Sequence, residues 1–261
     1  MDWRTARQLT VIFIAVLVVG GILFFLTYGY FHQPASCTDN KKNQGEEEVD
    51  CGGPCEPCAF KHQKPAEVFF ARVLPLRPGN YDVVAEIQNP NDHLAANPLA
   101  YRVHVFDDHG VEIATRENLT FAYPSDKIYI VESNFLTERK PVHASLEVID
   151  QATLWTFTND LRPEFQIGNK TYVVSADNEV KVTADVMSRA DFGFNQVEIR
   201  VALLDNAGNV VGAAKTILDH VSPRQSRRVE FTWPQAPQDL VAHVDIEAKA
   251  NGLDKTNVFL P

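Results

Sequence analysis

Four cysteines, Cys37, Cys51, Cys55 and Cys58, carry the clearest chemical potential in this 261-residue chain. They lie within 22 residues in which Val49 is the only aliphatic side chain, so this segment is too polar to form a hydrophobic core. Segments of this kind depend on cross-links instead. We predict two disulfides, formed outside the reducing cytosol, and the sequence leaves all three pairings open. The alternative is a zinc site, because the spacing Cys51-x3-Cys55-x2-Cys58 can bring three thiolates together.

Side chains that carry oxygen lie between the first two cysteines, at Asp39, Asn43, Glu46 and Asp50. Calcium prefers six to eight oxygen ligands and tolerates flexible loops. A loop closed by a disulfide therefore gives a hypothesis of a calcium clasp at these four residues, and no other cofactor is expected. The alternative is a hydrated acidic loop. Gly52 and Gly53 are expected to adopt positive φ in a tight turn between the cystines.

The same segment carries a family resemblance. Its run Asp39-Asn40-x-x-Asn43-Gln44-x-Glu46-x-x-x-Asp50-Cys51-Gly52-Gly53-x-Cys55-x-x-Cys58 resembles the DGxxNGxETxxDCGGxC module, a short cysteine-rich repeat of secreted and surface proteins of bacteria and archaea. The match departs at Asn40, where the family usually has glycine, and at Glu48, where the pattern is less acidic. The resemblance implies an extracellular stalk or spacer module rather than an activity.

No other group of residues forms a recognisable catalytic motif. The sequence has no Gly-x-Ser-x-Gly, no His-Glu-x-x-His and no phosphate-binding glycine loop. Asp107-Asp108-His109 is the densest titratable cluster, but Gly110 follows it between two strand patterns, so we predict a turn rather than a metal site. The sequence predicts that the protein is not an enzyme.

Arg224, Arg227 and Arg228 form the one basic cluster in an otherwise acidic region. They could dock an acidic protein or polymer. The alternative is that they keep an exposed edge strand soluble.

The segment before the cysteines is an uncharged run of 23 residues, 9–31. A helix of this length covers the hydrocarbon layer of a bilayer, which is about 30 Å thick. A cleaved signal peptide and a buried core helix are the alternatives; the length of the run and the bulky residues after it favour an uncleaved anchor. Arg4 and Arg7 precede the run, so we place residues 1–8 in the cytosol and the C-terminal part outside the cell membrane. Without Asp2, Arg4 and Arg7, the chain carries a net charge of −11, which argues against binding nucleic acid.

Beyond residue 66 the hydrophobic pattern has period two, typical of strands. Tyr101–Phe106 alternates and runs into Asp107–Gly110, and Val197–Leu204 runs into Asp205–Asn209 in the same way. Gly110 and Gly208 are 98 residues apart. This repeat predicts an all-β fold of two tandem immunoglobulin-like β-sandwiches, residues 66–162 and 163–261. One transmembrane helix (residues 9–31) and a small disulfide-rich module (residues 32–65) precede them.

The strand plan of both copies resembles the FxLYD and LEA14-like group of immunoglobulin-like envelope domains. Trp155 and Trp233 are expected in a core or at the domain junction rather than on a ligand platform. The junction, residues 159–164, is short and contains Pro163, so we expect limited flexing between the copies.

These patterns together predict a single-pass, non-catalytic extracytoplasmic protein that acts as a structural, adhesive or accessory module of the cell envelope. Its partners would be the membrane and another envelope protein or surface polymer. The alternative is a glycan- or small-ligand-binding module, which predicts a row of exposed aromatic residues on one sheet face. Five candidates for that row do not form an evident row in the sequence: Tyr123, Tyr129, Tyr172, Phe192 and Phe194.

Overall fold

The computed structural model describes residues 3–31, 36–160, 162–237 and 239–260. The chain divides into two compact units, Met1–Lys61 and His62–Pro261. The predicted cytoplasmic segment 1–8 and the stalk 32–65 lie partly outside the described residues, and so does Leu161 in the predicted junction.

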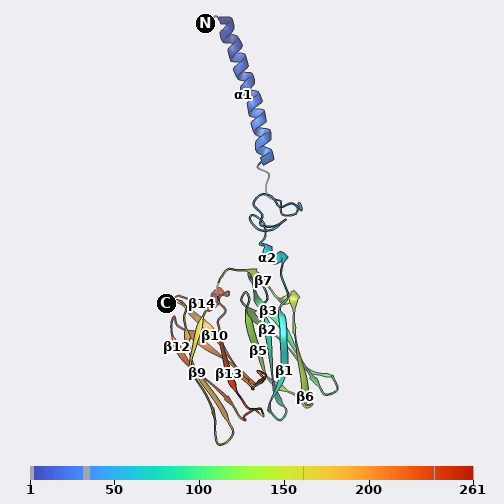
Figure 1. Ribbon diagram of the computed structural model, residues 1–261, viewed down its shortest axis with the longest axis vertical. Helices are drawn as coiled ribbons and strands as arrows, with labels where there is room; N and C mark the ends of the chain where they lie inside the picture. The colour runs from blue at the N-terminus through green and yellow to red at the C-terminus, as the bar shows by residue number, and fades with distance from the viewer. Residues whose placement is uncertain (1–2, 32–35, 161, 238, 261) are drawn as a thin grey trace. The chain divides into compact units, whose positions relative to one another are not determined.

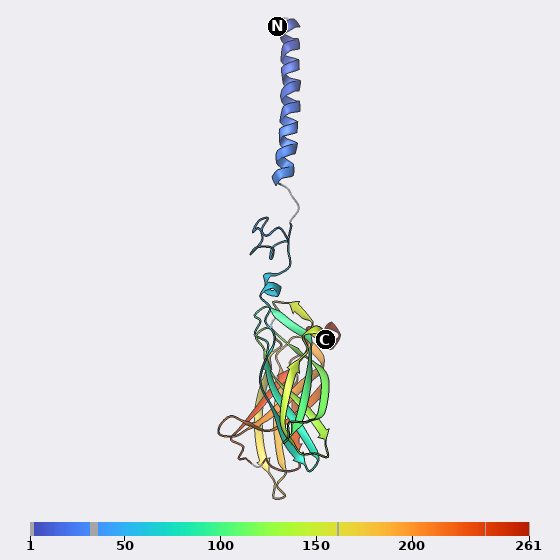
Figure 2. The same cartoon turned by 90° about the vertical axis from the view of Figure 1, so that its right-hand side faces the viewer.

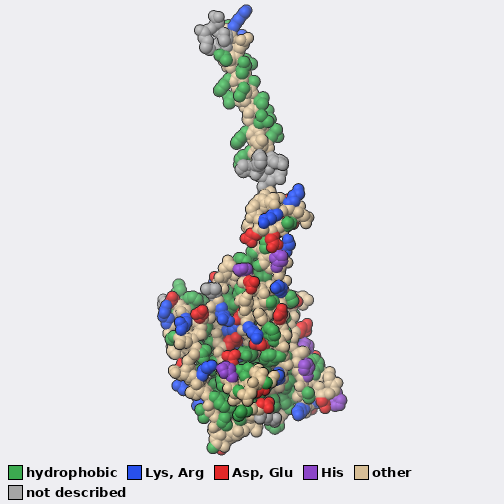
Figure 3. Space-filling model, in the orientation of Figure 1, with side chains coloured by type: hydrophobic (Ala, Val, Ile, Leu, Met, Phe, Trp, Pro, Cys, Tyr) green, Lys and Arg blue, Asp and Glu red, His purple; other side chains and the backbone are tan. Residues whose placement is uncertain are grey.

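The first unit begins with the helix α1 (Trp3–Phe31). Within it, Arg7–Tyr28 forms a 22-residue stretch of mean hydropathy 3.0, long and apolar enough to span a membrane. Figure 3 shows hydrophobic side chains over the visible face of α1, and large residues such as Val11 and Phe25 are exposed. A buried core helix would cover these side chains, so the core-helix alternative does not fit α1.

The cysteine module follows α1 and ends in the short helix α2 (Cys58–Lys61). Disulfides join Cys37 to Cys55 and Cys51 to Cys58. Gly52 and Gly53 have φ of +77° and +59°, as predicted for the turn between the cystines. A Cβ atom at position 53 would lie 2.2 Å from the carbonyl oxygen of Gly45, so the close approach of the two loops requires glycine there.

The described residues of the second unit form four antiparallel sheets, drawn from two sides in Figures 1 and 2. We call β1–β7 the first sandwich and β8–β14 the second. One sheet of the first sandwich has the strand order β1 (Glu67–Arg77), β2 (Asn80–Gln88), β5 (Lys127–Leu136). Its other sheet has the order β4 (Glu112–Ala122), β3 (Leu94–Asp107), β6 (Pro141–Val148), and β7 (Trp155–Phe157) also pairs with β3. One sheet of the second sandwich has the strand order β12 (Ser226–Trp233), β9 (Val180–Ser188), β8 (Phe165–Val174). Its other sheet has the order β11 (Val210–Val221), β10 (Gly193–Leu204), β13 (His243–Lys249), and β14 (Val258–Phe259) also pairs with β10. Two 3₁₀ turns, η1 (Asp150–Ala152) and η2 (Lys255–Asn257), complete the elements.

Each sandwich encloses its own hydrophobic core. In β3, Tyr101, Val103 and Val105 point into the first core, while Arg102 and His104 lie on the other face. This is the alternation that the period-two pattern predicted. The second core contains Phe194, Phe231 and Trp233, among others, so Trp233 is a core residue. Trp155 packs against the edge of the first core.

A third apolar cluster joins the two sandwiches. It contains Leu74, Val84 and Val131 from the sheet β1-β2-β5, and Ala202, Val210 and Ala213 from the sheet β11-β10-β13. These strands are therefore buried on both faces: Val83 and Ala85 of β2 face the first core, while Val84 between them faces the second sandwich. The short junction predicts limited flexing between the sandwiches. The sequence did not reveal that two sheets also pack face to face across this interface.

Candidate functional site

The cysteine module uses all four cysteines in its two disulfides, and the described chain holds no free cysteine. With both pairs oxidised, no thiolate is left for the zinc site that was the alternative. The structure also selects one of the three pairings that the sequence left open.

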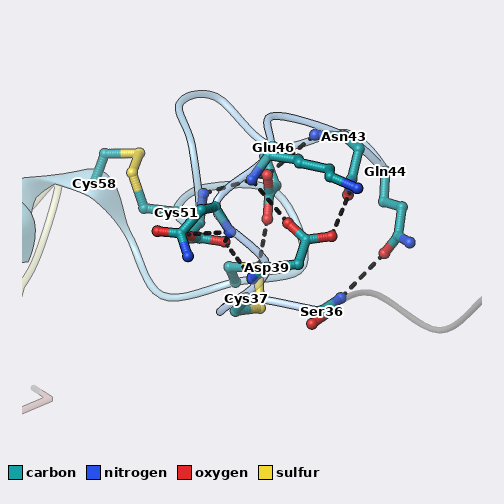
Figure 4. The surroundings of a disulfide bond; sticks show 12 residues. Ser36, Cys37, Asp39, Asn43, Gln44, Glu46, Cys51 and Cys58 are labelled. Carbon is teal, nitrogen blue, oxygen red and sulfur yellow. Dashed lines mark hydrogen bonds between the residues drawn. A yellow bond between two sulfur atoms is a disulfide. The ribbon is translucent and has the colours of Figure 1, made fainter.

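The carboxylates between the cysteines accept hydrogen bonds from the loop itself (Figure 4). Asp50 Oδ1 accepts from the backbone N–H of Asp39 at 2.9 Å and of Asn40 at 3.1 Å. Glu46, which is buried, accepts from the N–H of Asn43 at 3.1 Å, and Asn43 Nδ2 donates to Asp39 Oδ2 at 2.9 Å. These four residues therefore converge within one closed loop and hold its backbone in place. Calcium binding at them stays a prediction.

The three arginines of the basic cluster point to separate partners. Arg224 lies in a turn and its Nε donates to Asp191 at 2.8 Å, while Arg228 on β12 donates to Thr183 Oγ1 at 3.1 Å. Arg227 donates to the carbonyl of Asp219 at 3.5 Å. Since β12 is an edge strand, this arrangement is compatible with the alternative that the arginines protect a sheet edge.

Asp107 shapes the hairpin turn that was predicted at its position. Its Oδ1 accepts from the N–H of His109 and of Val111, both at 2.9 Å, and its carboxylate pairs with Arg139. Burial acts to raise the pKa of Asp107, but these hydrogen bonds and Arg139 together hold it below its usual value. Asp205 repeats the turn in the second sandwich, where its Oδ1 accepts from the N–H of Ala207 and of Asn209 at 2.8 Å.

The densest set of buried charges lies where the two sandwiches meet, and sequence reasoning missed it. Lys249 of β13 is 2% exposed, and its Nζ lies 2.6 Å from Asp126 Oδ1, before β5 of the first sandwich. The same Nζ donates to the carbonyl of Lys127 at 2.8 Å and lies 3.3 Å from Glu247. Burial lowers the pKa of Lys249, and the carboxylates of Glu247 and Asp126 oppose that shift.

Further polar contacts cross the interface beside this lysine. Buried Arg200 lies 3.3 Å from Glu247 and donates to Thr120 Oγ1 of the first sandwich at 3.4 Å. The hydroxyl of Tyr123 accepts from the N–H of Gly252 at 2.8 Å, and burial raises the pKa of Tyr123 to about 12. Arg72 Nη2 donates to Asn209 at 3.1 Å.

Glu132 forms a second buried centre on the first sandwich. It is 3% exposed and accepts from the Tyr101 hydroxyl at 2.6 Å, from Asn118 at 3.1 Å and from Arg116 at 3.2 Å. Lys215 of the second sandwich lies 3.6 Å away. Burial acts to raise the pKa of Glu132, but the Tyr101 hydrogen bond and the neighbouring cations hold it below its usual value.

A cleft of about 490 Å³ opens between the sandwiches next to Lys249. The first sandwich contributes Asn97, Pro98 and Leu119–Phe121 to its wall, and the second contributes Gln196, Glu198 and Asp219 among others. The five aromatic residues considered for a ligand platform do not line up at a surface, since Phe194 lies in the second core and Tyr123 in the interface.

Comparison with known proteins gives no family for this chain: no family model and no curated protein matches it. Solved structures with low similarity include red sea bream transglutaminase, at 10% identity and a TM-score of 0.22, over 71% of this chain and 29% of that chain. A complex of the exo-chitosanase CsxA of Amycolatopsis orientalis with PNP-beta-D-glucosamine has 11% identity and a TM-score of 0.20, over 58% of this chain and 22% of that chain. The chain therefore spans less than a third of the length of either protein. Similarity at this level carries no functional argument.

Proposed function

We propose that this chain is a single-pass membrane protein whose extracytoplasmic part is a non-catalytic structural, adhesive or accessory module of the cell envelope. The observation that carries the proposal is the interface between the sandwiches. Buried ion pairs and an apolar cluster hold the two sandwiches together, so that both can contact a partner as a single unit. The immunoglobulin-like character of both sandwiches belongs to the same proposal and is supported by their antiparallel sheets and repeated hairpin turns.

The proposed address rests on α1 and on the cysteines. An exposed apolar stretch of 22 residues suits the bilayer, and the basic Arg4 and Arg7 precede most of it, which favours a cytoplasmic N-terminus. Two disulfides in a segment without a hydrophobic core suit an oxidising compartment. Uncleaved anchoring, rather than removal as a signal sequence, is part of this proposal.

The function is tested by cross-linking in intact cells with a lysine-reactive reagent that does not cross membranes. Exposed lysines on the sandwiches, such as Lys181 and Lys215, are available to it. Recovery of one defined envelope protein, or of a surface polymer that carries amino groups, cross-linked at mapped lysines, is expected. Recovery of cytosolic proteins alone contradicts the proposed address and function. A chain with Leu17→Arg and Val18→Arg in α1 is the control, since each central charge costs about 3 kcal/mol of membrane insertion.

A ligand-binding module is the second candidate. The observation that favours it is the cleft between the sandwiches, because ligand sites occur preferentially where domains meet.

A further inference from the structure

The cleft between the sandwiches has the size of a ligand site and walls from both sandwiches. Its volume of about 490 Å³ falls within the range of about 300–1,000 Å³ that is common for small-molecule sites. Asn97 and Pro98 line one side and Gln196 and Asp219 the other, so the cleft exists only while the interface holds the two sandwiches together.

The wall of the cleft is fixed by amide side chains before any ligand arrives. Asn257 Oδ1 accepts from the backbone N–H of Gln196 at 2.7 Å, and its Nδ2 donates to the Gln196 carbonyl at 3.0 Å. Asn195 donates to the carbonyl of Thr256 at 2.8 Å, and Asn251 donates across the cleft to Asn97 Oδ1 at 3.0 Å. Fixed walls reduce the ordering cost of binding.

Several polar groups in the cleft remain available to a ligand. The side chains of Gln196 and Asp219 make no hydrogen bond or ion pair with the described part of the chain, and both are exposed. Asn97 accepts a hydrogen bond from Asn251 through Oδ1, so its Nδ2 can donate to a ligand. Asn195 donates through Nδ2 to Thr256, so its Oδ1 can accept from a ligand. The cleft thus offers both donors and acceptors, which suits hydroxyl groups because each hydroxyl also donates and accepts.

Charge narrows the class of ligand. Lys249 lines the cleft but is paired with Asp126 and Glu247, so it does not offer a free cation to a ligand. Asp219 and Asp254 leave the rim negative, which disfavours anionic ligands. The five aromatic candidates do not line up at a surface, so the apolar surface for the C–H face of a sugar ring comes instead from Pro98 and Leu119, the latter 60% exposed.

We propose that this cleft binds a neutral oligosaccharide, whose hydroxyl groups are held by Gln196 and Asp219. The inference rests on the proposed function only in taking the sandwiches as an interaction module, and it does not depend on membrane anchoring.

The test is isothermal titration calorimetry of the full-length protein in detergent. The probes are the neutral oligosaccharides cellotetraose, mannotetraose and N-acetylated chitotetraose, with tetragalacturonate as the anionic and tetralysine as the cationic probe. At least one neutral probe is expected to bind with a dissociation constant of about 1 mM or below, and tetragalacturonate is expected not to bind. The double variant Gln196→Ala, Asp219→Ala loses two hydrogen bonds to ligand and is expected to bind at least about ten-fold more weakly.

The matched control is Asp177→Ala, which removes an exposed aspartate from the turn between β8 and β9, outside the cleft lining. Its affinity for the neutral probe is expected to equal that of the unaltered protein. The proposal is overturned if no neutral probe binds up to about 10 mM, if tetralysine alone binds, or if the double variant binds as tightly as the control. None of these results bears on membrane anchoring, which is tested separately by protease protection in cells.

Discussion

Replacing Lys249 by methionine removes the charge at the centre of the interface while keeping most of the side-chain volume. Lys249 is 2% exposed and its Nζ lies 2.6 Å from Asp126 Oδ1, which is itself buried. Removing one partner of a buried pair typically costs about 3–5 kcal/mol, because the remaining charge stays buried without compensation. Arg162 remains 2.8 Å from Asp126 but is 55% exposed, so we expect a loss near the lower end, about 3 kcal/mol.

The assay is urea unfolding of the full-length protein in detergent, followed by tryptophan fluorescence. Trp155 reports on the first sandwich and Trp233 on the second. The unaltered protein is expected to unfold in one transition, since both sandwiches share the interface, and Lys249→Met is expected to lower the midpoint and separate the transitions.

The matched control is Lys181→Met, which breaks the 2.8 Å ion pair between Lys181 and Glu230, both about half exposed. Surface pairs of this kind contribute at most about 1 kcal/mol. In a double-mutant cycle with Asp126→Asn, the two interface changes should show a coupling of about 1–3 kcal/mol. A loss from Lys249→Met no greater than that from Lys181→Met, or losses that simply add, would refute the proposed role of the buried pair.

Three further predictions concern pH, the disulfides and calcium. Burial raises the pKa of Asp82, so Asp82→Asn should increase the free energy of unfolding at pH 7, and this gain should shrink as the pH falls through the raised pKa. Glu132→Gln has the opposite sign: it should lower the free energy of unfolding by about 1–3 kcal/mol at pH 7, and this cost should shrink as the pH falls through the lowered pKa of Glu132. Urea titrations at several pH values that show parallel trends for the two variants would contradict these assignments. Replacing Cys37 and Cys55 together by serine removes a disulfide of sequence separation 18 and should destabilise the cysteine module by about 3 kcal/mol. The measurement is the rate of proteolysis between residues 37 and 58, which should rise. An unchanged rate would mean that this disulfide does not stabilise the module. If Asp39, Asn43, Glu46 and Asp50 bind calcium, millimolar calcium should slow that proteolysis in the unaltered protein and not in Asp50→Asn; identical rates with and without calcium would end the calcium hypothesis.

Local features of the fold could be predicted from the sequence because they depend on neighbouring residues. The hairpins at Asp107 and Asp205 follow from an aspartate and a glycine between two alternating strands. In β3, the alternation of apolar and polar residues predicted which side chains point into the core. The turn at Gly52 and Gly53 was predicted for the same reason.

The interface could not be predicted in this way, because it joins residues far apart in the sequence, such as Arg200 and Thr120, 80 positions apart, and Lys249 and Asp126, 123 positions apart. Lys249 ends an alternating stretch, Asp245 to Lys249, in which charged residues look like the solvent face of an edge strand. Only the packing of a second sheet over that face buries Lys249 against Asp126. Two continuous apolar runs were the available signals, Val83-Val84-Ala85 in β2 and Val201–Leu204 in β10, because such runs indicate strands buried on both faces.

The most direct test of the proposed membrane address is protease protection in intact cells that produce the chain with one tag at each terminus. Protease added outside the cells should remove the C-terminal tag, while the N-terminal tag stays protected and remains with the membrane fraction together with α1. The variant Leu17→Arg, Val18→Arg should lose membrane association, which controls for the role of the apolar segment. A C-terminal tag that is protected in intact cells and cut only after lysis would contradict the account, and so would release of the chain without its N-terminal tag.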